Sequence, residues 1–187
     1  MGNYKYIVIG GSAGSFQTVT QILSALPKNY DFSMFLTLHR LKTVRTGFVE
    51  ALSLKSSLNV LEPQDKEFIR SNKIYLAPAN YHMYIELGNY ISLSTEEPVN
   101  HSRPSIDLTF QSAAYVFKDK MIGVLLSGAN KDGAAGMKAI KDAGGLTIVQ
   151  DPEECQVKTM TAAALQLTEI DKVMKTTEIV NFLKNLK

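Results

Sequence analysis

Three residue types that can together carry out acyl transfer occur in separate short motifs of this sequence. Ser12 lies in GGSAGS, His39 closes DFSMFLTLH, and Asp132 lies in SGANKDGAAG. A serine hydroxyl becomes a good nucleophile when an imidazole takes its proton, and a carboxylate orients that imidazole and stabilises its charged form. One interpretation of the sequence is therefore a Ser-His-Asp hydrolase.

Each of these motifs follows a run that is predicted to be a buried strand. The first strand is predicted over Lys5–Gly10, the second over 31–39, and a central one over 121–128. Because the carboxyl ends of parallel strands share one edge of a sheet, we expect the three side chains to meet there. A helix predicted over Ser15–Leu26 would turn its free N–H groups toward a developing oxyanion.

The rest of the chain continues the alternation of strands and helices. Further strands are predicted over 59–63, 73–78, 146–150 and 171–174, and helices over 44–54, 105–118, 130–145, 158–167 and 176–186. Residues 82–95 alternate with period two around Gly88-Asn89, which predicts an antiparallel hairpin. The pattern predicts an α/β fold, a three-layer α/β/α sandwich whose doubly wound, mostly parallel sheet carries a small antiparallel hairpin. We expect residues 1–187 to form a single domain.

Composition excludes several classes of function. Apolar residues make up 45% and charged residues 20% of the chain, as in globular proteins, and the net charge of +2 gives no reason to expect nucleic acid binding. No apolar run reaches the length of a membrane span, and the N-terminus does not fit a signal peptide. A lone cysteine excludes a disulfide framework and a multi-cysteine metal site. We expect a cytoplasmic protein without metal, cofactor or membrane insertion.

Each candidate also has a purely structural interpretation. Ser12 fits a tight strand-to-helix turn in which only the glycines matter, His39 fits a half-buried strand-end histidine, and Asp132 fits a residue that complements a helix dipole. The competing titratable residues are His82, His101, Asp107 and Asp151. Cys155 follows two glutamates, which would raise the pKa of its thiol and indicates an inert side chain.

Two nucleotide-binding motifs fail when they are tested against the residues. The fingerprint G-x-G-x-x-G has Ser12 where its second glycine should stand, and no Walker loop is present. The order serine, histidine, aspartate also differs from the α/β-hydrolase order of serine, acid, histidine. The motifs alone therefore do not decide whether Ser12 is the nucleophile of a hydrolase or part of a structural turn.

Five blocks, in order, resemble the catalytic domain of the chemotaxis receptor methylesterases, the CheB family. They are VIGGSAGS, LHR, IYLAPANYHM, RPSIDLTFQSAA and GVLLSGANKDGAAGMKAIKDAGGLTIVQD, and the likeness runs from about Lys5 to Val173. The resemblance implies a serine hydrolase that removes methyl esters from glutamates on chemoreceptor helices, with deamidation of receptor glutamines as a second activity. It implies Ser12 as nucleophile, His39 as base and Asp132 as the residue that orients it.

The sequence departs from the family pattern around these three residues. Ala13 replaces a threonine, Ala129 replaces a methionine, Arg40 replaces a methionine, and Ser15 replaces a glycine, while KTMTAA lacks the family's proline. Ala13 and Ala129 remain candidates to bind the oxyanion through backbone N–H groups, and Arg40 and the hairpin are candidates to contact substrate.

Members of this family usually carry an N-terminal receiver domain as well. We expect no receiver domain within residues 1–187. Regulation by a separate receiver protein is therefore one possibility that the resemblance implies. The alternatives are a serine esterase or amidase with another substrate, a non-catalytic binding module on the same fold, and a nucleotide-binding domain.

Overall fold

A computed structural model describes residues 3–40 and 47–186 of the chain. Its centre is a seven-stranded sheet in which every neighbouring pair of strands is parallel. Across the sheet the strands are β3 (Asn59–Leu61), β4 (Lys73–Leu76), β2 (Ser33–Leu38), β1 (Tyr6–Gly11), β7 (Met121–Leu125), β8 (Leu146–Gln150) and β9 (Lys172–Met174). The predicted fold class is confirmed.

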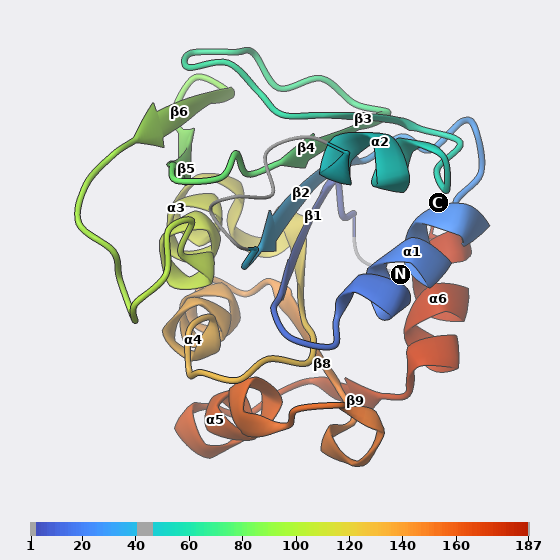
Figure 1. Cartoon of the computed structure of the whole chain (residues 1–187), viewed down its shortest axis with the longest axis vertical. Coiled ribbons are helices and arrows are strands. Elements are labelled where there is room, and N and C mark those ends of the chain that lie inside the picture. The colour runs from blue at the N-terminus through green and yellow to red at the C-terminus, as the bar shows by residue number, and fades with distance from the viewer. Residues whose placement is uncertain (1–2, 41–46, 187) are drawn as a thin grey trace.

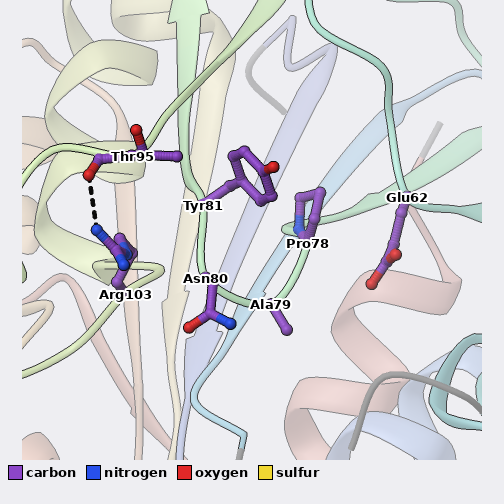
Figure 2. Close-up of a pocket in the computed structure, with 7 residues that line it drawn as sticks. All are labelled: Glu62, Pro78, Ala79, Asn80, Tyr81, Thr95 and Arg103. Carbon is purple, nitrogen blue, oxygen red and sulfur yellow. Dashed lines mark hydrogen bonds between the residues drawn. The ribbon is translucent and has the colours of Figure 1, made fainter. Parts of the chain in front are cut away.

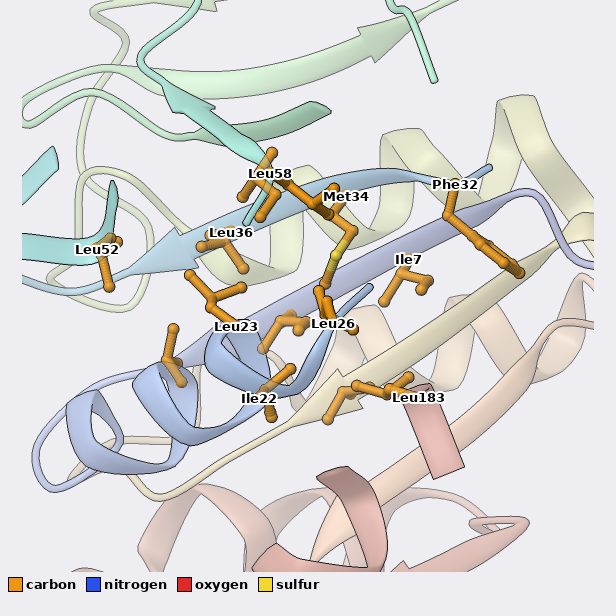
Figure 3. Close-up of a cluster of buried hydrophobic side chains, with 14 of the residues drawn as sticks. Ile7, Ile22, Leu23, Leu26, Phe32, Met34, Leu36, Leu52, Leu58 and Leu183 are labelled. Atoms are coloured by element: carbon orange, nitrogen blue, oxygen red, sulfur yellow. The ribbon is translucent and has the colours of Figure 1, made fainter. Parts of the chain in front are cut away.

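Helices cover both faces of the sheet (Figure 1). One face is covered by α1 (Phe16–Ala25), α2 (Phe48–Ser53) and α6 (Thr176–Lys184). The other is covered by α3 (Ile106–Phe117), α4 (Ala134–Asp142) and α5 (Thr159–Leu167). Successive residues of a strand point to opposite faces, so Ile7 and Ile9 pack under the first helical layer and Val8 under the second. Figure 3 shows the first of these two cores, with Ile22 and Leu23 of α1 beside strand residues Met34 and Leu36.

The predicted hairpin is also present, as a separate two-stranded sheet. β5 (His82–Glu86) and β6 (Tyr90–Ser94) are antiparallel. Gly88 and Asn89 take positive φ angles of 97° and 65°, as a tight hairpin turn requires. The hairpin is attached to α3, where the Thr109 hydroxyl donates to the Met83 carbonyl (2.8 Å).

The main differences from expectation lie at the ends of elements. The helix predicted over 44–54 is present as α2 from Phe48, and residues 44–46 lie outside the described part of the chain. Two short 3₁₀ helices, Lys118–Lys120 and Pro152–Glu154, were not predicted, because single turns leave no periodicity in a sequence.

The order of the strands diverges on the two sides of β1. The chain first builds the sheet outward from β1 on the β2 side, and later returns to add β7 on the opposite side of β1. Ligands of doubly wound sheets bind where the connections diverge in this way. Among the described residues, no helix combines the length and apolar character needed to span a bilayer.

Candidate active site

His39 and Asp132 form a direct pair at the carboxyl edge of the sheet. His39 follows β2, Asp132 lies in the loop between β7 and α4, and His39 Nε2 lies 2.8 Å from Asp132 Oδ2. The Asp132 side chain is fully buried and that of His39 is 12% exposed. Two residues separated by 93 positions therefore meet with the geometry of an oriented imidazole.

The start of α3 holds the carboxylate of Asp132. The backbone N–H groups of Ile106 (2.7 Å) and Asp107 (3.1 Å) and the hydroxyl of Ser105 (2.9 Å) all donate to it. Burial alone would raise the pKa of Asp132, but hydrogen bonds from His39 and from these N–H groups outweigh burial and lower it. Asp132 is thus a fixed, ionised partner for the imidazole.

Asp107, which lies in α3, in turn binds the backbone at the start of α4. Its Oδ1 accepts hydrogen bonds from the N–H groups of Gly133 (2.8 Å) and Gly136 (2.7 Å). Burial raises the pKa of the Asp107 carboxyl, and the nearby charge of Asp132 adds to that effect. Asp107, a rival of Asp132 in the sequence, therefore braces the neighbouring helix, while Asp132 is the carboxylate that contacts His39.

Ser12 occupies a sharp turn between β1 and α1. The N–H and the hydroxyl of Ser15 both donate to the Ser12 carbonyl, at 3.1 and 2.7 Å. Gly14 has a φ of +82°, and an added Cβ there would come within 2.5 Å of Gln156 Cβ, so the turn requires glycine. The His39 N–H donates to the Gly11 carbonyl (3.0 Å), which brings the backbones of the serine and histidine segments together. Among the described residues, no hydrogen bond joins the Ser12 hydroxyl to the His39 ring.

Ser127, which the sequence did not single out, ties this turn to the loop after β7. Its carbonyl accepts from the Ser12 N–H (2.9 Å), and its hydroxyl donates to the Ala13 carbonyl (2.8 Å). The same hydroxyl accepts from the Val157 N–H (3.0 Å). Ser127 is fully buried and ends the apolar run of β7, which is the one signal that could have identified it.

The two candidate oxyanion donors lie at the protein surface, near the carboxyl ends of β1 and β7. Ala13 follows Ser12 in the turn, and Ala129 lies in the loop after β7, and both are exposed. Within residues 3–40 and 47–186, no carbonyl or side chain accepts a hydrogen bond from either backbone N–H. Both N–H groups are therefore available to a bound ligand.

Arg40, a predicted substrate contact, lies inside the protein instead. Its side chain is 3% exposed, forms an ion pair with Glu62 and donates to the Ala77 carbonyl (3.2 Å). Its guanidinium also stacks over the Phe48 ring, 5.0 Å from the centroid. Arg40 therefore joins β2, β4 and α2 internally, and its charge is not presented to solvent.

A cleft of about 510 Å³ lies between the segments that follow β3, β4 and β6 (Figure 2). Glu62 stands on one side of the cleft, Tyr81 and Asn80 line its middle, and Thr95 and Arg103 close the other side. Arg103 donates to the carbonyls of Thr95 (2.6 Å) and Glu96, which fixes the segment between the hairpin and α3. One lining residue, Glu62, pairs with Arg40, which directly follows His39 in the chain.

The remaining histidines have other surroundings. His82 is fully buried, accepts from the Ser105 N–H (3.1 Å) and contacts the Glu97 carbonyl (3.1 Å), so it positions the start of α3. His101 is exposed. Of the three histidines, the structure thus brings His39 together with Asp132.

The other two candidates, Asp151 and Cys155, lie near the end of β8. Asp151 caps a short 3₁₀ helix by accepting from the Glu153 N–H (3.0 Å). The pKa of the Cys155 thiol is raised chiefly by burial, with the charges of Asp151 and Glu154 adding to it. The predicted direction is confirmed, although burial is the larger cause. In the described part of the chain, no three His, Cys, Asp or Glu side chains gather as a metal site would need.

Comparison with known proteins relates this architecture to one family. The family model described as CheB methylesterase matches residues 7–183. A crystal structure of the CheB methylesterase catalytic domain of Thermotoga maritima superposes with a TM-score of 0.92 at 30% identity, covering 98% of this chain and 99% of that one.

Relatives from three organisms agree with this match. A Leptospira interrogans protein, whose name assigns protein-glutamate methylesterase and protein-glutamine glutaminase provisionally, is 40% identical over 95% of this chain and 92% of its own length. Proteins named protein-glutamate methylesterase/protein-glutamine glutaminase from Clostridium acetobutylicum (31% identical) and Archaeoglobus fulgidus (33%) match 97% and 95% of the chain. The chain spans 54% of the length of each of these two. The chain belongs to the CheB methylesterase family.

Proposed function

We propose that this chain is a protein-glutamate methylesterase that hydrolyses glutamyl methyl esters with Ser12 as nucleophile, His39 as base and Asp132 as the residue that orients His39. The observation that carries the proposal is the buried 2.8 Å contact between His39 and Asp132, one strand away from the Ser12 turn. The family membership and the names of the relatives supply the reaction class.

The contact between His39 and Asp132 supports Nδ1 of His39 as the base. Nε2 faces the ionised carboxylate of Asp132, so Nε2 carries the proton of the neutral ring. The lone pair is then on Nδ1, which takes the proton of Ser12 as its Oγ attacks the ester carbon. The resulting imidazolium is stabilised by Asp132, and Nδ1 returns the proton to the departing methoxide, releasing methanol.

A water molecule completes the reaction by the same route. His39 removes a proton from water, the hydroxide attacks the acyl carbon, and the Ser12 oxygen leaves with the proton from Nδ1. The products are the free glutamate carboxylate and the original enzyme. A glutamine side chain would form the same acyl-enzyme with loss of ammonia, in line with the second activity in the names of the relatives.

The N–H groups of Ala13 and Ala129 are the proposed oxyanion donors. Both are exposed and unpaired among the described residues, and they flank the Ser12 turn on the β1 and β7 sides. Backbone donors do not depend on side-chain identity, which explains how alanine can replace threonine and methionine at these positions.

The proposed substrates are methylated helices of chemoreceptor-like proteins. The site is open at the sheet edge, and the 510 Å³ cleft, whose lining residue Glu62 pairs with Arg40, leaves room for the protein chain around a modified glutamate. A cytoplasmic location, independence of metal and cofactor, and control by a separate receiver protein stay predictions from the sequence.

The test is methanol release from a methylated chemoreceptor signalling fragment, with Ser12→Ala beside the wild type. Ser24→Ala, which changes an exposed serine of α1, serves as the matched control. We expect release by wild type and by Ser24→Ala, and none above background from Ser12→Ala. Release that persists in Ser12→Ala would overturn the nucleophile, and no release by folded wild type would overturn the substrate.

A further inference from the structure

A second serine hydroxyl faces the nitrogen that is proposed as the base. Ser102 Oγ lies 3.4 Å from His39 Nδ1, on the side of the ring opposite to the Asp132 contact. No motif in the sequence selects Ser102, because it lies in the NHSRPS loop, 63 residues from His39. The three-dimensional structure alone brings the two together.

The position of Ser102 is set by a tight turn. The backbone N–H groups of Val99 and Ser102 each donate to the carbonyl of the other residue, at 3.1 and 2.9 Å. Asn100 and His101 between them have φ angles of 49° and 61°. Two successive residues with positive φ, closed by reciprocal bonds, form the rigid turn of a hairpin. Ser102 is therefore presented by a fixed backbone.

Asn130 connects this turn to the loop that carries Asp132. Its Nδ2 donates to the Asn100 carbonyl (3.2 Å) and to Ser102 Oγ (3.1 Å). Its Oδ1 accepts from the Asp132 N–H (3.2 Å). The hydroxyl of Ser102 and the backbone of Asp132 are thus held by the same amide side chain.

The Ser102 proton has two acceptors at equal distance. Because Asn130 already donates to Ser102 Oγ, the hydroxyl proton can point to His39 Nδ1 or to the Asn100 carbonyl, both 3.4 Å away. When Nδ1 is neutral, Ser102 can donate to it. When Nδ1 has taken a proton, the hydroxyl can turn to Asn100 and offer its lone pair to Nδ1–H.

We infer that Ser102 is a positioning residue for His39, which supports the imidazole ring in both of its protonation states. The inference rests on the proposed function for the role of His39. Nδ1 has a single lone pair, and at 3.4 Å the contact with Ser102 is longer than a strong hydrogen bond, so the Ser12 hydroxyl can displace that of Ser102 when it attacks. Asp132 and Ser102 then hold the ring from opposite nitrogens.

The kinetic test compares Ser102→Ala with Ser102→Thr, which keeps the hydroxyl. We expect Ser102→Ala to lower kcat roughly 3- to 10-fold with KM nearly unchanged, as fits the loss of one modest hydrogen bond, and Ser102→Thr to recover most of the rate. His101→Asn, a change in the exposed neighbour that tolerates the same φ, should leave both constants as in wild type. Equal rates for Ser102→Ala and wild type, or equal losses in the alanine and threonine variants, would overturn the inference.

A second readout does not depend on turnover and separates this inference from the proposed function. In ¹⁵N NMR spectra of the histidines, assigned with His39→Gln, we expect Nε2 of His39 to carry the proton in wild type and in Ser102→Ala. The Nδ1 resonance should shift when the serine hydroxyl is removed and return toward wild type in Ser102→Thr. An Nδ1 resonance that is the same in wild type and Ser102→Ala would contradict the inference even if the esterase is active.

Discussion

Asp132 combines complete burial with a full set of donors, and this combination makes it the central residue of the site. Its carboxylate receives hydrogen bonds from His39, from Ser105 and from two backbone N–H groups at the start of α3. A buried carboxylate is costly unless it is fully hydrogen-bonded, so this charge is retained only because α3 supplies the donors. In the proposed mechanism, this charge stabilises the imidazolium that forms during the reaction.

Replacing that carboxylate with an amide tests its role. In Asp132→Asn one oxygen becomes an NH₂ group, which must face one of the donors that now surround the carboxylate. We therefore expect His39 to lose its orientation and kcat/KM to fall by about 10³- to 10⁴-fold, with the fold retained by circular dichroism. Asp142→Asn on the exposed side of α4 is the control, and a loss below tenfold in Asp132→Asn would show that Asp132 does not orient the base.

At the scale of elements, the site depends on how the turn after β1 is fastened to the loop after β7. Ser127 makes this connection through its carbonyl to the Ser12 N–H and through its hydroxyl to Ala13 and Val157. Ser15 closes the turn from the other side by donating twice to the Ser12 carbonyl. The position of Ser12, the proposed nucleophile, is therefore set by three segments that two serines join.

Removal of the Ser127 hydroxyl should weaken both the fold and the reaction. Ser127→Ala leaves the Val157 N–H and the Ala13 carbonyl without their partner, which we expect to lower the free energy of unfolding by about 1–3 kcal/mol. Because the turn also loosens, kcat/KM measured on folded protein should fall. Ser33→Ala is the matched control, since Ser33 is a buried serine whose hydroxyl bonds Arg70 at the opposite edge of the sheet. We expect Ser33→Ala to lower the free energy of unfolding without changing kcat/KM. If Ser127→Ala also left kcat/KM unchanged, the Ser127 hydroxyl would not be needed to position the Ser12 turn.

For the molecule as a whole, the layers of the fold and the proximity of the site segments could be predicted from the sequence, because both follow from the order of strands and helices. Runs such as MIGVLLSG identify buried parallel strands, and the parallel topology then brings the ends of β1, β2 and β7 to one edge. That rule is enough to predict that the segments of Ser12, His39 and Asp132 lie near one another.

The parts that could not be predicted from the sequence are contacts between distant loops. Ser102 and Ser127 act through turns whose partners lie 28 to 114 residues away, and no periodicity or spacing records such pairs. Arg40 was a candidate substrate contact, but an acid, a carbonyl and an aromatic ring from other elements surround it inside the protein. Side-chain networks of this kind are decided by tertiary packing.

Activation of Ser12 by the His39–Asp132 pair is tested most directly by covalent labelling with a fluorophosphonate, followed by peptide mapping by mass spectrometry. Such reagents modify serines that a neighbouring base has activated. We expect one adduct per chain, on the peptide that contains Ser12, and loss of that adduct in His39→Gln. An adduct on Ser102, or labelling of Ser12 that is undiminished in His39→Gln, would contradict this activation.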